Sequence, residues 1–547
     1  MTRNLFWALR HLRLEQSIRT LWIDAICINQ ADVEERGQQV SLMKDIFQQS
    51  ERTVVWLGEE SEDSESAVRL IKSLAVASRS HSTHKIGQIF KDLKSFPPLY
   101  DPAWRALAIM LHRPWFHRAW IVQEVSVAKD VLIVCGRAVI PWDDLVCGIR
   151  HAVDLGLFIA YGGSMTYQAL RLFASRSNFQ SHTPPMLHDI LLGNRSFLAT
   201  DARDKVFGLL SLADPEDVRA MGVTPDYRLT VDRVYKQITK ALLKRPDLSA
   251  FSASCVYNAS LGQRLPSWVS DWSVSDPSMP LKSTDSLNYG DVLPNISSSN
   301  LDFNAARSTI SQPVFGPGEN TLGLEGLLVD QVESVGALSR TRYLRHVSHM
   351  FELFVQCYDI LETMKDWEVV ARAHSPDPYI AGKSHFHAYW HTLCAGRVPP
   401  DLASIRKDPR FKYYIITRSL RPFVRLVIRW FPRSERDTWY NRLFYSMFQT
   451  AWRVCGFSPA KIQRIGFPPE RRLSNHRRMV RTKGGYIALA PRSTKQGDWI
   501  GVFRGGNLPL VVRRDGDNFI LIGESYVYGL MNGEAWDESK CRLIWFK

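Results

Sequence analysis

The sequence has no uninterrupted apolar run long enough to cross a bilayer, so a transmembrane helix is not expected. Its first residues, MTRNLFWALRHLRLEQ, turn polar within a few positions and lack a small-residue cleavage site, so no secretory signal is expected either. The eight cysteines are scattered, without a CxxC pair or a zinc-like spacing. Reduced, buried thiols in a cytoplasmic protein are therefore the simplest interpretation.

Three common catalytic signatures are also missing: the chain has no Walker loop, no GxSxG elbow and no HExxH pair. The segment HFHAYWH places His387 and His391 four residues apart on one helix face, with His385 nearby. Zinc normally requires further ligands, and no cysteine or acidic residue stands beside these histidines. We therefore expect surface or loop histidines here and no metal site.

Acidic residues are scarce in one part of the chain. Residues 401–480 contain 18 Lys and Arg against 5 Asp and Glu, a net charge of +13 out of +14 for the whole chain. Four arginines recur there at helical spacing: Arg418, Arg421, Arg425 and Arg429. This basic segment has three interpretations, namely weak contact with an anionic membrane surface, binding of nucleic-acid phosphates, or a solvated helical face with Arg stems packed on aromatics. Pro422 and Pro432 interrupt the pattern and favour the solvated face, and no specific nucleic acid is expected.

A chain of 547 residues is expected to form two or three domains. In residues 1–215, apolar periodicity predicts helices at 4–13, from 32 onward, 64–77, 116–128 and 201–212, and strands in the first half of 18–28, at 53–58 and at 131–135. Asp32 is expected to cap its helix, with Glu35 completing a capping box. The alternation of helices and strands predicts a parallel α/β layer.

Residues 216–547 show a different pattern from residues 1–215. Residues 216–480 are predicted to be mainly helical, with a linker near 274–318 that is rich in Ser, Asn, Asp and Pro, and with the basic segment 401–480. Residues 481–547 contain short strands divided by the turns GGN at 505–507 and DGDN at 515–518. Those turns are typical of hairpins, so a small antiparallel β module is expected at the carboxy end.

Two motifs hold the candidate site residues. In LWIDAICINQ, Asp24, Cys27 and Asn29 follow the expected strand, at the edge where open parallel sheets bind ligands. The alternative is that these polar side chains only cap the next helix and fix the loop. In RPWFHRAWIVQE, Trp120 and Glu124 share a helix face, and an indole beside a carboxylate suits a sugar. The alternative is that Glu124 pairs with Arg118 or Lys129 and Trp120 is core.

The ordered motifs LWIDAICINQ, RPWFHRAWIVQE and DARDKVFGLLSLA, between Leu21 and Ala213, resemble those of the fungal heterokaryon-incompatibility (HET) domain. The run GDWIGVFRGGNLPLVVRRDGDNFILIGESYVYGLMNGEAW is similar to the end of many long HET proteins, and LPSWVSDWS at 265–273 extends the likeness to the middle. The resemblance implies a role in self/non-self recognition and programmed cell death in a filamentous fungus. It also implies protein partners and self-assembly through the HET domain.

HET domains resemble the Toll/interleukin-receptor (TIR) fold, a flavodoxin-like parallel sheet between helices. Some TIR domains cleave NAD with a glutamate four residues beyond a tryptophan. That resemblance implies Glu124 as catalytic residue and Trp120, Asp24, Cys27 and Asn29 as residues that bind the nucleotide. NAD is then a candidate substrate, and no cofactor is required. An NAD-cleaving enzyme and a non-enzymatic scaffold docking through its basic surface are the alternatives to the signalling role.

The sequence departs from the HET pattern at its front. A block like YxALSYxWG usually forms the first strand, and this chain starts at the helix that follows it. In a flavodoxin-like order the first strand is central, so the sheet is expected to be incomplete at its amino-terminal side. Either the strands in TLWIDA and TVVWLG pair directly, another segment fills the gap, or Met1 is not the true start.

Overall fold

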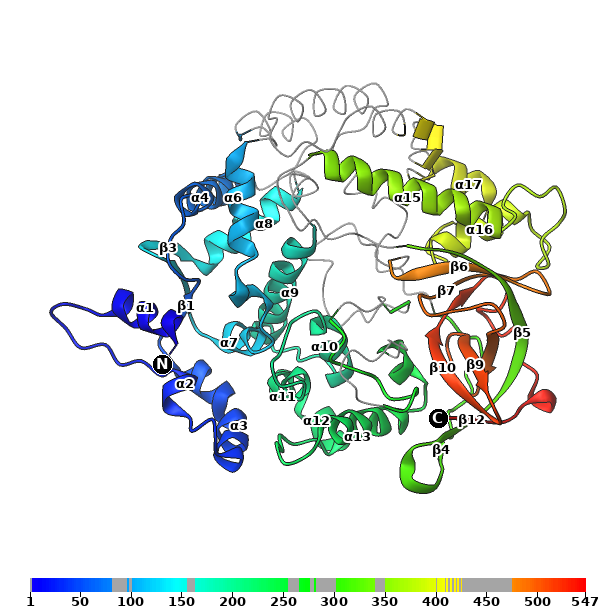
Figure 1. Cartoon of the computed structure of the whole chain (residues 1–547), viewed down its shortest axis with the longest axis horizontal. Coiled ribbons are helices and arrows are strands. Elements are labelled where there is room, and N and C mark those ends of the chain that lie inside the picture. Colours follow the sequence, from blue (N-terminus) through cyan, green and yellow to red (C-terminus); the bar gives the residue numbers. More distant parts are fainter. Residues whose placement is uncertain are drawn as a thin grey trace.

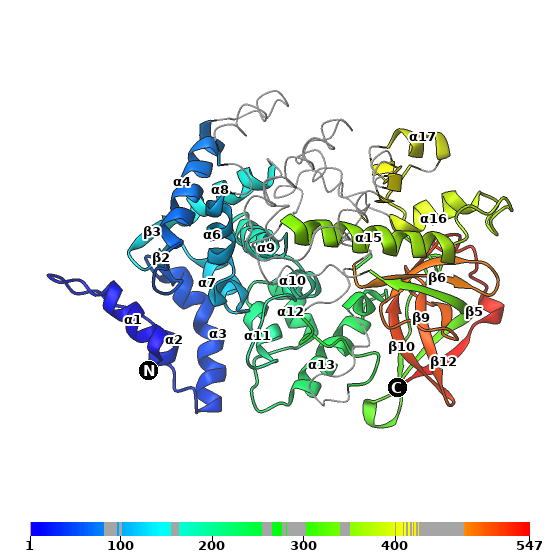
Figure 2. The same ribbon diagram turned by 45° about the horizontal axis from the view of Figure 1, so that its top comes forward.

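The structure is a computed structural model of the chain. It describes residues 2–80, 96–97, 101–154, 163–253, 265–275, 280–281, 302–339, 350–399 and 475–547, and, between 401 and 425, residues 401–408, 410–411, 414–415, 418–419, 421–422 and 425. Helices of the amino-terminal half lie on one side of the molecule and a β-barrel on the other (Figure 1). In both views α15 and α16 lie against the barrel beside β6 (Figure 2).

The first 154 residues combine helices with three short strands. The elements are α1 (Arg3–Leu12), α2 (Asp24–Cys27), α3 (Val33–Gln49), β1 (Thr53–Trp56), α4 (Ser64–Ser80), α6 (Pro102–Leu111), the 3-10 turn η1 (Pro114–His117), α7 (Ile121–Val127), β2 (Val131–Cys135), β3 (Ala138–Pro141) and α8 (Trp142–Asp154). The cap at α3 is as predicted, because Asp32 accepts the backbone N–H groups of Glu34 and Glu35. Glu35 reaches back, but its carboxylate accepts the N–H of Asn29 at 3.0 Å rather than that of Asp32.

The strands form a small sheet in the order β1-β2-β3. β1 and β2 run parallel, with Thr53 opposite Val131 and Trp56 opposite Val134. β3 returns antiparallel to β2 through a tight turn in which Gly136 adopts a left-handed φ of 55°. This small sheet thus holds one parallel pair, β1 and β2, and the flavodoxin-like sheet stays a prediction.

The strand predicted in the first half of residues 18–28 does not form. Ile23 has extended dihedrals, but residues 18–23 belong to no strand and Ile18 is 96% exposed. An extended segment becomes a strand only when a neighbour takes its N–H and C=O groups, and no described strand lies beside this one. The direct pairing considered for TLWIDA and TVVWLG is therefore not observed among the described residues.

A second group of helices packs on the first. They are α9 (Gly163–Gln180), α10 (Leu187–Asn194), α11 (Asp204–Leu210), α12 (Pro215–Met221), α13 (Val231–Leu243) and the 3-10 turn η3 (Ser249–Ala253). One apolar core runs through both groups and includes Trp104, Ile121, Ile133, Leu209 and Ile238. The helices predicted at 116–128 and 201–212 are present in shortened form as α7 and α11.

The carboxy-terminal region is a barrel. Its elements are β4 (Val314–Phe315), the 3-10 turn η4 (Pro317–Glu319), β5 (Leu322–Leu338), β6 (Arg477–Thr482), β7 (Ile487–Pro491), β8 (Trp499–Phe503), β9 (Leu510–Asp515), β10 (Asn518–Glu524), β11 (Tyr526–Val527), the 3-10 turn η5 (Glu538–Lys540) and β12 (Arg542–Phe546). β5 pairs with both β12 and β8, which closes the ring β5-β12-β10-β9-β8. Closure leaves those strands without an open edge.

β5 and most of β6 lie in residues that the sequence predicted to be mainly helical. The distal half of β5 leaves the ring and pairs with β6, which continues to β7 and β11. Between β5 and β6 the chain forms α15 (Met350–Val370), α16 (His385–Leu393) and α17 (Leu402–Lys407). Within the expected linker, Phe303, Ala305 and Ala306 are buried in the apolar clusters around the barrel. No helix among the described residues is long and apolar enough to span a membrane.

Candidate functional site

Trp120 and Glu124 lie on one turn at the start of α7. Trp120 directly precedes the helix, and the backbone N–H of Glu124 donates to the Trp120 carbonyl at 3.1 Å. Their side chains meet different partners. The indole of Trp120 turns to α11, whereas the Glu124 carboxylate is influenced by Arg118 and Asp24.

The Trp120 side chain joins two of the motifs singled out above. Its Nε1–H donates to the Asp204 carboxylate at 3.0 Å. A Cβ added at Gly208 would lie 3.3 Å from the indole ring, so the ring packs closely on this place of α11. Gln123, on the same turn of α7, donates to Ser211 at 2.8 Å. These contacts join the segment RPWFHRAWIVQE to the segment DARDKVFGLLSLA.

Asp204 is a site residue that the sequence analysis missed. Its carboxylate accepts the Trp120 indole N–H and the Tyr227 hydroxyl, the latter at 2.6 Å, while burial raises its pKa. The guanidinium groups of Arg36 and Arg203 lie 3.8 and 5.2 Å from the centre of the Tyr227 ring. This aromatic and ionic network ties α3, α7 and α11 together. In the sequence, only the position of Asp204 within DARDKVFGLLSLA pointed to a role for it, and that position does not reveal that Trp120 and Tyr227 are its hydrogen-bond donors.

The next residue of that motif, Lys205, is also buried. Its ammonium donates to the Arg195 carbonyl at 2.8 Å and to the Phe197 carbonyl. Burial lowers the pKa of Lys205 to about 7. A buried ammonium is costly unless its N–H groups are satisfied, and here two backbone carbonyls satisfy them. Lys205 therefore fixes the chain before α11 rather than facing a ligand.

Arg113 begins the RPWF motif and holds the end of β1. Its guanidinium donates to the carbonyls of Leu57 and Glu59 at 2.8 and 2.9 Å and to Ser64 at 3.2 Å. Those groups surround Gly58, whose φ is 103°. The motif thus positions the strand end and the start of α4.

Glu124 is partly buried, and its side chain has no hydrogen bond or ion pair within the described part of the chain. Burial raises its pKa to about 7, the Arg118 charge lowers it, and the Asp24 carboxylate raises it. Lys129, a partner considered from the sequence, instead donates to the Gln49 carbonyl. A carboxyl group with this pKa exchanges its proton near neutral pH, as general acids and bases do.

The structure brings one residue of LWIDAICINQ close to Glu124. Asp24 is the first residue of α2, and its carboxylate accepts the N–H of Ala25 at 2.8 Å. Cys27 and Asn29 are exposed. Asn29 uses its side-chain oxygen to accept the N–H of Ala31 at 3.2 Å, so it also shapes the loop. Asp24 thus lies within electrostatic reach of Glu124, with Cys27 at the end of α2 and Asn29 in the loop that follows.

The histidines of HFHAYWH are not at the surface, contrary to expectation. His387 and His391 are buried in α16 and their rings stack with centroids 4.3 Å apart. The helix packs its apolar and aromatic face against the barrel, and these histidines lie on that face. Among the described residues no group of three or more His, Cys, Asp or Glu could hold a metal ion.

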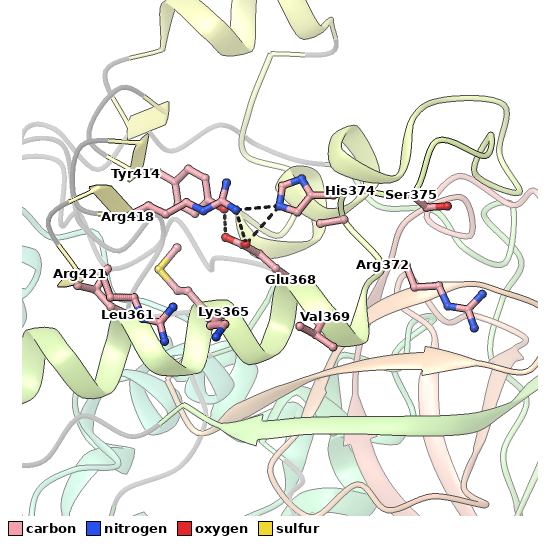
Figure 3. A pocket seen from close by; sticks show the side chains of 12 residues that line it. Leu361, Lys365, Glu368, Val369, Arg372, His374, Ser375, Tyr414, Arg418 and Arg421 are labelled. Atoms are coloured by element: carbon pink, nitrogen blue, oxygen red, sulfur yellow. Dashed lines mark hydrogen bonds and ion pairs between the residues drawn. The ribbon is translucent and has the colours of Figure 1, made fainter. Parts of the chain in front are cut away.

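Two arginines of the basic segment are neutralised by α15. Arg418 lies 3.3 Å from Glu368, which also receives His374 and the Tyr414 hydroxyl, and Arg421 lies 2.6 Å from Glu362. Apart from Glu362, these side chains line a cavity of about 510 Å³ along α15 (Figure 3). Arg425 is exposed, and Arg429 lies outside the described residues. The ion pairs account for these two arginines, and because most of the segment lies outside the described residues, weak contact with a membrane surface stays a prediction.

Comparison with known proteins identifies both ends of the chain. Residues 1–124 match the family described as heterokaryon incompatibility protein (HET), and residues 471–545 match the Het-6 β-barrel domain. Both ends of the chain are therefore similar to parts of heterokaryon-incompatibility proteins. The chain is 25% identical to heterokaryon incompatibility protein 6, OR allele, of Neurospora crassa, over 99% of this chain and 85% of that protein. No solved structure matches. Trp120, Glu124, Asp24, Cys27 and Asn29 all fall within the HET match.

Proposed function

We propose that this chain acts in heterokaryon incompatibility by associating with a second copy of itself through the first part of the HET domain. The incompatibility function comprises self/non-self recognition and cell-death signalling in a filamentous fungus. It is supported by the HET match over residues 1–124 and by the similarity to the Neurospora crassa protein over nearly the whole chain. The proposal adds which surface carries the signal.

The observation that carries the proposal is the exposure of apolar side chains near the amino end. Among the described residues, six of sixteen exposed large apolar side chains belong to residues 6–42: Phe6, Leu14, Ile18, Ile26, Val33 and Leu42. We call these six the amino-terminal apolar surface. α1 to α3 project at one side of the molecule, away from the barrel (Figure 1). Apolar side chains concentrated in this way are typical of interaction surfaces.

The backbone beside this surface is also open. Residues 18–22 form no backbone hydrogen bond with another described residue. Among the described strands, β1 pairs only with β2, so its other edge has no described strand beside it. Unpaired extended backbone next to apolar side chains is a template for pairing with another chain, and a second copy supplies the same template.

Sedimentation velocity of the full chain over a range of concentrations tests the proposal. We expect concentration-dependent association that Ile26→Asp abolishes. Ile310→Asp is the matched control, because Ile310 is 62% exposed and Ile26 is 58% exposed. A monomer at all concentrations, or equal association of the parent and both variants, would show that this surface does not join two copies.

A second candidate function is NAD cleavage by a TIR-like site, with Glu124 as catalytic residue. It is favoured by the partly buried Glu124 carboxyl group, which has no side-chain hydrogen bond among the described residues and a pKa of about 7. In its ionised form this group would accept hydrogen bonds from the ribose hydroxyls on the nicotinamide side. Asp24, Cys27 and Asn29 would border the nucleotide, and Trp120 would hold α7 in place through Asp204.

Release of nicotinamide from NAD by the purified full chain tests this second function. Glu124→Gln keeps the size of the side chain and removes its charge, so we expect loss of release by a factor of about 10² or more. Glu51→Gln, an exposed substitution between α3 and β1, is the control. Equal release by the parent and Glu124→Gln would remove Glu124 from the catalytic role.

A further inference from the structure

A cavity of about 660 Å³ lies between α16 and the barrel, outside the region that matches the HET domain. It is lined by the α16 residue His391, by tyrosines of the barrel, and by the turn that follows β11. Its volume falls in the range typical of small-molecule sites. We infer that this cavity binds an organic ammonium group, either a free amine or a lysine side chain of a partner.

The wall of the cavity is aromatic and carries negative charge. Tyr486, Tyr526 and Tyr528 line it together with two carboxylates, Asp302 and Glu534. Burial raises the pKa of all three tyrosines, and the Glu534 carboxylate raises each further, so it lies near all three phenols. Aromatic faces beside a carboxylate attract a cation.

One lining residue of the cavity carries a buried ring nitrogen that has no hydrogen-bond partner among the described residues. His391 is 7% exposed, and its Nε2 has no hydrogen bond to any described residue. The ring makes a backbone hydrogen bond at Pro399, and burial beside His387 lowers the pKa of His391 to about 4. The imidazole is therefore neutral near pH 7. With the Pro399 carbonyl taking the other ring N–H, Nε2 is an acceptor that needs a donor.

Contacts among the surrounding residues fix the shape of the cavity. The Tyr528 hydroxyl is 3.1 Å from Nδ1 of His387, and the Tyr528 ring centroid is 5.2 Å from that of His391. Gly396 has a φ of 79°, and a Cβ there would lie 3.0 Å from the Tyr526 ring. Arg397 follows Gly396 and donates to the Leu281 carbonyl, and it is not among the lining residues.

These features select one ligand chemistry. An anion would meet the Asp302 and Glu534 carboxylates, and no Lys or Arg lines the described cavity. A quaternary ammonium would satisfy the rings but would leave the His391 acceptor unpaired, which is costly in a buried site. A primary ammonium group on an alkyl stem satisfies the rings, the carboxylates and His391 together.

Isothermal titration calorimetry of the full chain tests this with n-pentylammonium, n-pentanol and n-pentyltrimethylammonium at fixed ionic strength. We expect saturable binding of n-pentylammonium, with n-pentanol weaker by about tenfold or more, since charge-assisted contacts are lost. Glu534→Gln should weaken n-pentylammonium by about tenfold, whereas Asp517→Asn, in the exposed β9–β10 turn, should leave it unchanged. His391→Phe should weaken n-pentylammonium more than n-pentyltrimethylammonium.

Binding of a glycine-flanked lysine peptide distinguishes the two sources of the ammonium group, a free amine and a lysine side chain of a partner. Tighter binding of the peptide than of n-pentylammonium assigns the cavity to a protein partner, and the reverse assigns it to a free amine. Both results support an ammonium site. The inference is overturned if n-pentanol binds as tightly as n-pentylammonium, if no saturable binding occurs, or if Glu534→Gln binds as the parent does while keeping the parent's unfolding midpoint.

Discussion

In the carboxy-terminal barrel, β5 has hydrogen-bonded neighbours along most of its length, whereas residues 18–23, in the region that matches the HET domain, have no described strand beside them. The barrel strands bury their apolar side chains completely at places such as Ile500, Val511 and Ile522. The amino-terminal apolar surface leaves Ile18 and Ile26 in solvent. The difference suggests a division of labour, in which the barrel supplies a self-contained scaffold and the HET end supplies association.

The largest effect on the free energy of unfolding is expected when a buried ion pair of the barrel is removed. Glu524 and Arg477 form an ion pair at 3.0 Å, and both side chains are at most 5% exposed. Glu524→Ala leaves a buried guanidinium without its charge partner, so we expect a loss of about 3–5 kcal/mol in the free energy of unfolding. Urea denaturation measures it. Glu333→Ala removes a half-exposed partner of Arg481 and should cost about 1 kcal/mol or less; equal losses would contradict the scaffold role of the buried pair.

The barrel also shows what the sequence could and could not predict. The strands after Gly485 and the hairpin turns were predictable, because alternation and turn residues are local. β5 was not, because its partners β6, β8 and β12 lie more than 130 residues away in the sequence. The same holds in the HET domain: Asp32 was recognised as a helix cap from adjacent residues, whereas the contact of Trp120 with Asp204 joins residues 84 apart.

The candidate site was predictable in part for the same reason. The spacing of Trp120 and Glu124 correctly predicted a shared helical turn, but not that the indole faces α11. The pattern gave no reason to choose between a paired and an unpaired Glu124. Nor did it indicate that His391 is buried against the barrel, because burial depends on which elements pack together.

A smaller effect on the free energy of unfolding is expected from Glu124, and the size of this effect depends on pH. Its pKa is raised from 4.5 to about 7 in the folded protein. Between these values the folded state keeps a proton that the unfolded state has released, so stability falls as pH rises and then levels off above 7. The change is at most about 3 kcal/mol. Glu124→Gln should flatten this slope in urea denaturation at pH 5, 6, 7 and 8, and an unchanged slope would show that Glu124 is solvated like a surface carboxylate.

A still smaller effect on the free energy of unfolding is expected where RPWFHRAWIVQE contacts DARDKVFGLLSLA. Asp204→Ala leaves the Trp120 indole N–H and the Tyr227 hydroxyl without their acceptor, which should cost about 1–3 kcal/mol. Asp204→Asn keeps an oxygen acceptor and should cost less. If the alanine variant unfolds with the midpoint of the parent, Trp120 is not held by Asp204.

The smallest effect on stability is expected at the amino-terminal apolar surface. Ile18→Ser replaces a side chain that is 96% exposed and should change the free energy of unfolding by about 0.5 kcal/mol or less. A thermal unfolding scan at low protein concentration checks this. A large loss would mean that Ile18 packs against the domain and is not part of an association surface.

The central claim is that the HET end signals by association while the barrel supports it. The most direct measurement is cell death, by vital-dye staining of fused hyphae, when a strain expressing this chain meets strains of the same species that lack it. The account predicts death with the parent and with Ile310→Asp, and survival with Ile26→Asp at equal protein level. Undiminished death with Ile26→Asp would contradict the claim that the amino-terminal apolar surface carries the signal.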